Sequence, residues 1–128
     1  MKHLTPKEAH QYTIDHPDAV MIDCRSEMEF LFVGHPVGAH HVAYNELPDW
    51  EVNPHFVGQV KKVASMHRPV VLICRSGHRS LDAGLALEKA GFAEVYNVSD
   101  GFEGPLDEKH RRGNISGWRS EGLPWEQL

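Results

Sequence analysis

A cysteine and two arginines directly follow a short apolar run near the middle of the chain. Residues 69–80 read PVVLICRSGHRS, so Cys74 ends the run, and Arg75 and Arg79 flank a serine, a glycine and a histidine. A thiol beside fixed cations and a helix N-terminus ionises more easily than a free cysteine, and the thiolate is the nucleophilic form. Successive backbone N–H groups in such a loop also form a concavity that binds anions. The stretch therefore predicts an anion cradle with a nucleophilic thiol at its base.

This loop needs two regular elements to hold it, one on each side. Residues 69–73 are apolar and three of the five are β-branched, which is typical of a buried strand. Leucines with helical spacing follow from about Ser80, and Gly91 ends them. Gly77 suits a backbone that turns sharply or approaches a ligand. Ligands of strand–loop–helix units bind beyond the carboxyl ends of the strands, which is where this sequence places the cysteine.

Strands and helices alternate along the rest of the chain. Thr5 and Glu8 fit a capping box, and Pro6 suits the first helical position. We predict strands over 19–23, 39–43, 69–73 and 93–98, and helices over 6–16, 27–33, 54–66 and 80–90. The alternation favours an α/β fold with a mainly parallel sheet covered by helices on both faces. Without a repeat, a low-complexity tract or a linker, residues 1–128 are expected to form a single domain.

Composition excludes several classes of function. The chain of 128 residues has 41% hydrophobic and 24% charged residues, which predicts a folded globule. Its formal charge of −5 argues against nucleic acid as a partner. No apolar run approaches the roughly 18–20 residues that cross a bilayer, and the first residues lack the apolar region of a signal peptide. We therefore expect a cytoplasmic protein without membrane partners, whose two cysteines are reactive or simply buried.

The cysteine loop resembles the active-site loop of the rhodanese family, the thiosulfate sulfurtransferases and their relatives. A second resemblance lies upstream, where Asp23-Cys24-Arg25 and Glu29 precede the segment 34–40, GHPVGAH. Pro36 stands there in place of the isoleucine usual in the family. Residues 97–104, NVSDGFEG, and the closing 122–124, GLP, also resemble family segments. The resemblance implies the rhodanese fold, a twisted, mainly parallel sheet of about five strands between helices.

The resemblance also implies a mechanism and assigns roles. Cys74 is expected to take a sulfane sulfur from thiosulfate or a similar small anionic donor as a persulfide, and to pass it to a thiol or protein acceptor, without a cofactor. Asp23, Arg25 and Glu29 are expected to support the structure. The residues expected to bind the donor are those of the loop, Arg75, Ser76, Gly77, His78, Arg79 and Ser80.

Of three other interpretations of the sequence, one stays open and two are disfavoured. Phosphatases and arsenate reductases on the same fold have one more residue between cysteine and arginine than the four of this loop, so sulfur transfer is favoured over phosphoryl chemistry. A persulfide carrier or docking module that serves a dedicated partner remains an alternative. The chain has ten histidines, but Cys24 and Cys74 lie far apart without paired thiols nearby, so no metal site is predicted.

The sequence leaves two interpretations open for Cys24 and two for the basic run 109–112. Cys24 is either a small core residue or a redox partner of Cys74, since both follow strands expected to end at the same edge of the sheet; the related phosphatases carry a disulfide-forming cysteine at this place. The basic run 109–112, KHRR, is either a solvated loop or a rim over the active site that attracts an anionic donor or a partner.

Overall fold

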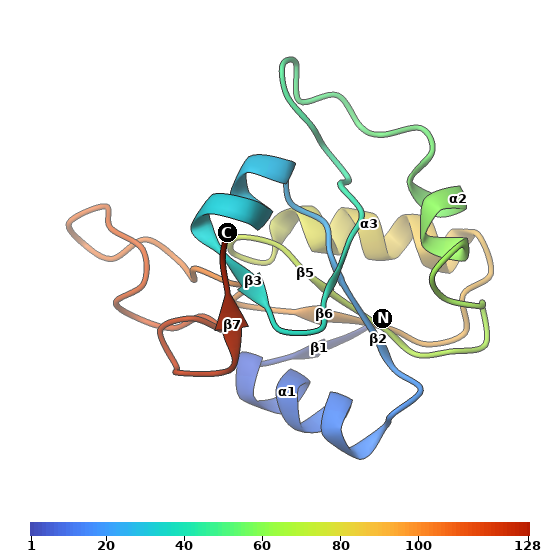
Figure 1. Ribbon diagram of the computed structural model, residues 1–128, viewed down its shortest axis with the longest axis horizontal. Helices are drawn as coiled ribbons and strands as arrows, with labels where there is room; N and C mark the ends of the chain where they lie inside the picture. The colour runs from blue at the N-terminus through green and yellow to red at the C-terminus, as the bar shows by residue number, and fades with distance from the viewer.

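The computed structural model describes all of residues 1–128 and contains a five-stranded parallel sheet. The strands lie in the order β1-β6-β5-β2-β4, and every neighbouring pair is parallel (Figure 1). Their bounds are β1 Lys2–Leu4, β2 Val20–Asp23, β4 His40–His41, β5 Val70–Ile73 and β6 Val95–Val98. The predicted α/β fold with a sheet of about five strands is confirmed.

Helices cover both faces of this sheet. Helix α1 (Pro6–Asp15) lies on one face, and α2 (Phe56–Lys61) and α3 (His78–Lys89) lie on the other (Figure 1). Because side chains alternate along a strand, β5 feeds two cores: Val70 and Leu72 join the larger cluster with α2 and α3, and Val71 and Ile73 join the smaller one with α1. All four residues of β2, β5 and β6 are buried, which is why these segments consist mainly of apolar residues and only Asp23 and Asn97 interrupt them.

The predicted start of α1 is confirmed in detail. Thr5 Oγ1 accepts a hydrogen bond from the Glu8 N–H at 3.2 Å, and Glu8 Oε1 accepts one from the Thr5 N–H at 2.9 Å. This capping box satisfies two backbone donors that a helix start would otherwise leave without partners. Pro6 occupies the first turn, as expected.

Several predicted elements are shorter or different in the structure. The segment predicted as a helix over 27–33 is a π-helical turn, η1 (Glu29–Val33). The helix predicted over 54–66 is only α2, because the Asn53 side chain accepts the His55 N–H and forms a turn before it. At its other end the Val63 N–H bonds to the Val60 carbonyl, a three-residue spacing that ends the α-helix. The strand predicted over 39–43 pairs only at β4, and the one predicted over 93–98 begins at Val95.

Three short strands are absent from the prediction. Strand β1 lies at the sheet edge, paired with β6. Strands β3 (His35–Pro36) and β7 (Trp125–Glu126) form a separate antiparallel pair that attaches the C-terminal segment. Strands of two or three residues are too short to show a hydrophobic period, and only their tertiary pairing defines them.

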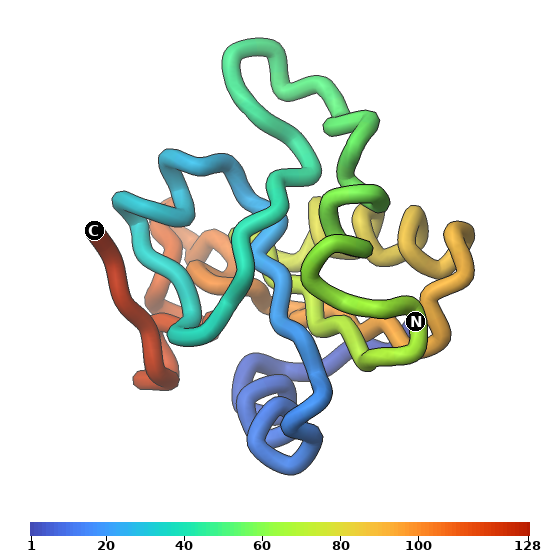
Figure 2. The backbone as a smooth tube through the Cα atoms, turned by 45° about the vertical axis from the view of Figure 1, so that its right-hand side comes forward, coloured from blue at the N-terminus to red at the C-terminus, as the bar shows by residue number.

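A long loop leaves the body of the molecule between β4 and α2. Figures 1 and 2 both show residues 42–55 projecting from the side of the sheet that α3 covers. No helix of the chain combines the length and the apolar character needed to cross a membrane.

Candidate active site

Cys74 occupies the junction between β5 and α3, with its side chain at the base of a loop. It is only 1% exposed. The Gly77 N–H donates to its Sγ at 3.1 Å, and Ser80 Oγ lies 3.1 Å from the same sulfur. The helix predicted over 80–90 begins at His78, so the loop after Cys74 is two residues shorter than predicted.

Gly77 and Asn97 fix the shape of this cradle. Gly77 has φ +101°, and a Cβ at this position would collide with the Ser99 carbonyl oxygen, so only glycine fits. Asn97 on β6 is buried, donates to the Gly77 carbonyl at 3.3 Å and accepts a hydrogen bond from the Ser80 hydroxyl. Sequence reasoning did not identify Asn97 as a site residue. The available signal was one amide in an otherwise apolar strand, VYNV.

The environment of Cys74 makes it an acidic thiol. A hydrogen bond with the Cys24 thiol lowers the pKa of Cys74 most, and burial opposes that effect. Hydrogen bonds from Ser80 and from the Gly77 N–H lower it further, so the pKa falls from 9.0 to about 5. Cys74 is therefore a thiolate at neutral pH.

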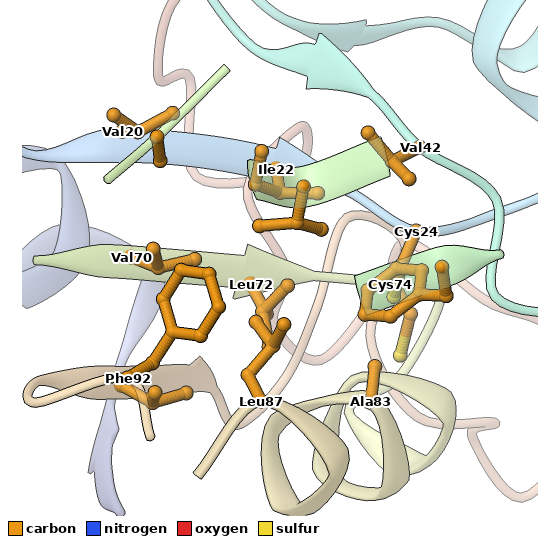
Figure 3. Close-up of a cluster of buried hydrophobic side chains, with 14 residues drawn as sticks. Val20, Ile22, Cys24, Val42, Val70, Leu72, Cys74, Ala83, Leu87 and Phe92 are labelled. Atoms are coloured by element: carbon orange, nitrogen blue, oxygen red, sulfur yellow. The ribbon is translucent and has the colours of Figure 1, made fainter. Parts of the chain in front are cut away.

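Cys24 lies beside Cys74 on the neighbouring strand. Both residues come directly after Asp23 and Ile73, which are partners in the parallel β2–β5 register, and neighbouring strands are about 4.8 Å apart. Both sulfurs belong to the same core cluster, next to Ala83 of α3 (Figure 3). The Ile73 carbonyl oxygen lies 3.4 Å from the Cys24 sulfur and competes with Cys74 for the single S–H proton of Cys24. The hydrogen bond with Cys74 and complete burial raise the pKa of Cys24, so it stays a neutral thiol.

Arg79 is held by Glu29 across the mouth of the site. Its Nη1 and Nη2 donate to the two Glu29 carboxylate oxygens at 2.7 and 2.9 Å. Its guanidinium also stacks 5.4 Å from the centre of the Trp50 ring in the projecting loop. Burial alone would raise the pKa of Glu29, but the hydrogen bonds and charge of Arg79, together with Ser26, lower it to about 2. Both Nη groups of Arg79 thus bond to Glu29, although the arginine still lines the cavity described below.

Asp23 and Arg25 form a fully buried ion pair behind the site. Arg25 Nη2 donates to Asp23 Oδ2 at 2.7 Å and also to the Gly34 carbonyl, and its guanidinium lies 4.5 Å from the Phe102 ring centre. Arg25 Nη1 is buried without a partner. These contacts connect the loop after β2 to the turn before β3 and to the segment after β6. Neither side chain reaches the cavity at Cys74.

A cavity of 440 Å³, the Cys74 cavity, opens above the sulfur. The loop contributes Cys74, Ser76, the exposed side chains of Arg75 and His78, and Arg79. The C-terminal tail contributes Pro105, Leu106 and Arg112. Of the basic run 109–112, only Arg112 lines this cavity. Residues 109–111 are exposed to solvent, so one part of the run is a solvated loop and the other is the rim of the cavity.

A second, larger cavity of 730 Å³ adjoins the first. It shares Arg75 and Arg79 with the Cys74 cavity, and it includes the exposed side chains of Met28, Leu47 and Trp50. One cavity is therefore cationic and contains the thiolate, and the adjoining one combines four hydrophobic side chains with charges of both signs. No group of three or more His, Cys, Asp or Glu side chains is arranged to hold a metal ion.

The fold and the site define a class: parallel α/β domains in which a thiolate is held by a strand–loop–helix cradle. A family model described as "Rhodanese-like domain" matches residues 5–107. The chain belongs to the rhodanese-like family, as its motifs had indicated. A relative named thiosulfate sulfurtransferase GlpE, from Stutzerimonas stutzeri, is 32% identical over 102 residues, which cover 80% of this chain and 82% of the relative.

Two solved structures are also similar to this chain. The crystal structure of Rv0390 from M. tuberculosis matches with a TM-score of 0.89 and 37% identity, covering all of this chain and 98% of the other. The solution structure of a polysulfide-sulfur transferase homodimer from Wolinella succinogenes matches with a TM-score of 0.68 and 25% identity, covering all of this chain and 80% of the other. At the family level these relatives support a sulfurtransferase-like protein.

Proposed function

We propose that this protein is a sulfurtransferase that moves a sulfane sulfur from thiosulfate, or a similar small anion, to a thiol or protein acceptor through a persulfide on Cys74. The observation that carries the proposal is the cradle itself: a thiolate with a pKa of about 5 accepts hydrogen bonds at the base of a cationic cavity. Relatives named thiosulfate sulfurtransferase and polysulfide-sulfur transferase support it.

In the first half-reaction, the Cys74 thiolate attacks the outer sulfur of thiosulfate. A new S–S bond forms to Cys74, the S–S bond of thiosulfate breaks, and sulfite leaves with the electron pair of that bond. Arg75 is exposed at the mouth and attracts the anion. Neither an oxidant nor a proton donor is needed, because the outer sulfur keeps the negative charge that it carries in thiosulfate and the electron pair of the broken bond leaves on sulfite.

In the second half-reaction, a nucleophilic acceptor attacks that terminal sulfur and Cys74 leaves as a thiolate again. The low pKa of Cys74 makes it a good leaving group in this step. The backbone N–H groups of Gly77 and Ser80, which donate to the cysteine sulfur in the resting enzyme, are placed to stabilise the charge in both states. We expect the reaction to occur in the cytoplasm, where cysteines such as Cys24 and Cys74, both unpaired here, remain reduced.

A second candidate function is a persulfide carrier for one protein acceptor. The adjoining cavity favours it, because Met28, Leu47 and Trp50 remain exposed there at about half of their surface. A carrier would accept sulfur once and release it only to its partner.

Turnover with thiosulfate as donor and cyanide as acceptor tests the proposal. The wild type should form thiocyanate over many cycles, and Cys74→Ala and Cys74→Ser should form none. A single equivalent of persulfide without turnover would favour the carrier. Full activity of the Cys74→Ala protein would refute both functions.

A further inference from the structure

Arg112 belongs to the C-terminal tail, yet it lines the Cys74 cavity together with Arg75. The family match ends at residue 107, so this arginine lies outside the segment that the family model describes. The neighbouring Arg111 is exposed and does not line the cavity. Arg112 is therefore the cation that the tail adds to the site.

Hydrogen bonds hold Arg112 in this position. Its Nη1 donates to the Gly104 carbonyl at 2.8 Å, and the next residue, Gly113, donates its N–H to the Glu103 carbonyl at 2.9 Å. The surrounding loop is closed by Asp107, whose carboxylate accepts hydrogen bonds from the Lys109 N–H, the Arg111 N–H and Asn114 Nδ2. A cation fixed before the ligand arrives loses less conformational entropy on binding than a free side chain does.

Apart from Cys74, the charged side chains that line the Cys74 cavity are all positive. Its lining contains three arginines and no carboxylate. Arg79 is neutralised by Glu29, whereas Arg75 and Arg112 take part in no ion pair. Glu103 does not line this cavity; it lines the adjoining cavity of 730 Å³ and, together with Arg112, a third cavity of 410 Å³. Two arginines without an ion pair thus face the space above the thiolate, and together they exceed its single negative charge, so the cavity favours an anionic ligand.

We infer that Arg112 is a specificity-determining residue that, together with Arg75, selects dianionic sulfur donors such as thiosulfate over monoanionic ones. This inference rests on the proposed function, because it names the charge class of donor for the same site. Coulomb energy is proportional to the charge of the ligand, so one fixed positive charge stabilises a bound dianion twice as much as a monoanion. A tenfold loss of affinity for the dianion then corresponds to a loss of about threefold for the monoanion.

Binding to a protein that cannot react gives the first test. In the Cys74→Ser background, the Kd of thiosulfate is measured by titration calorimetry for proteins that also carry Arg112→Gln, Arg112→Lys or Arg111→Gln. We expect Arg112→Gln to weaken binding about tenfold at low salt, and less as ionic strength rises, because the Debye length shortens. Arg112→Lys keeps the charge and should recover most of the affinity. Arg111→Gln, which changes the net charge equally, should change Kd less than twofold.

Kinetics with two donors give the second test. Methanethiosulfonate anion donates its sulfane sulfur in the same displacement as thiosulfate and releases methanesulfinate, but it carries one charge less. Arg112→Gln should lower kcat/KM about tenfold for thiosulfate and about threefold for methanethiosulfonate, mainly through KM. Equal losses for the two donors, or equal effects of Arg111→Gln and Arg112→Gln on Kd, would overturn the inference.

The two tests separate this inference from the proposed function. Thiosulfate binding that depends on Arg112, in a protein whose wild type transfers no sulfur, would support the anion site and refute the sulfurtransferase. Sulfur transfer that is indifferent to Arg112 would do the opposite. Absence of both binding and transfer would refute both.

Discussion

Replacing Cys24 with alanine is expected to make Cys74 a weaker acid. The fall of the Cys74 pKa from 9.0 to about 5 corresponds to about 5 kcal/mol of preferential stabilisation of the thiolate. The hydrogen bonds that supply it come from Cys24, from the side chain and backbone N–H of Ser80 and from the Gly77 N–H, and hydrogen bonds to a charged group contribute about 1.5–3 kcal/mol each. Burial destabilises the thiolate and therefore cancels part of this stabilisation. Removing the Cys24 thiol should therefore raise the pKa of Cys74 by about 1–2 pH units.

The consequence is largest below neutral pH. At pH 5.5 a thiol with a pKa of about 5 is about three-quarters ionised, whereas one with a pKa of about 6–7 is ionised to between about 3 and 24%. The rate of Cys74 alkylation by neutral iodoacetamide at pH 5.5 should thus fall about threefold to 25-fold in Cys24→Ala. At pH 8 the rates of the two proteins should nearly agree.

The assay follows the alkylation rate from pH 4 to 10, and intact mass counts the adducts. Cys74→Ala serves as the blank, because Cys24 is buried and its pKa is raised. Cys24→Ser is the matched control, because its hydroxyl can still donate to Cys74. A wild-type inflection near pH 9, or the same inflection in Cys24→Ala as in the wild type, would refute the explanation of the low pKa.

Three further outcomes are expected. Glu29→Gln should lower the free energy of unfolding by about 1–3 kcal/mol at neutral pH, since it breaks a largely buried ion pair with Arg79. Because the pKa of Glu29 falls from 4.5 to about 2, the contribution is complete above pH 4.5 and disappears as pH drops through 2; denaturation curves that differ equally at pH 7 and pH 3 would contradict this. Hydrolysis of an aryl phosphate should be negligible beside sulfur transfer, because only four residues separate Cys74 from Arg79; comparable rates would exclude the sulfur-transfer interpretation of the loop. After peroxide converts Cys74 to a sulfenic acid, Cys24 should displace water to form a disulfide, so Cys24→Ser should regain less activity with dithiothreitol than wild type; equal recovery would leave Cys24 a core residue.

The main framework of the fold was predictable because its central strands are buried on both faces. Residues 19–22 and 69–73 show this as uninterrupted apolar runs. The order of strands in the sheet was not predictable, and neither was the β3–β7 pair, because two-residue strands have no period and exist only through tertiary pairing.

The candidate site was predictable where its residues are adjacent in sequence. The loop from Cys74 to Ser80 carries its own signal of thiol, glycine and cations. Asn97 reaches the site only through folding, because a single polar residue in a strand does not reveal its position. For Arg112 the sequence left a rim over the active site as one of two interpretations of the run 109–112, and only the fold shows which residue of the run lines the cavity. The pairing of Arg79 with Glu29 was hidden for the same reason, since 50 positions separate them.

In the proposed reaction Cys74 accepts a sulfur atom, and the mass of the intact protein after incubation with thiosulfate reports this step without any coupled assay. The wild type should gain one sulfur atom, roughly 32 Da, which cyanide then removes, while Cys74→Ala should gain nothing and Cys24→Ala should still gain one. No added mass on the wild type, or an equal addition to the Cys74→Ala protein, would contradict the account.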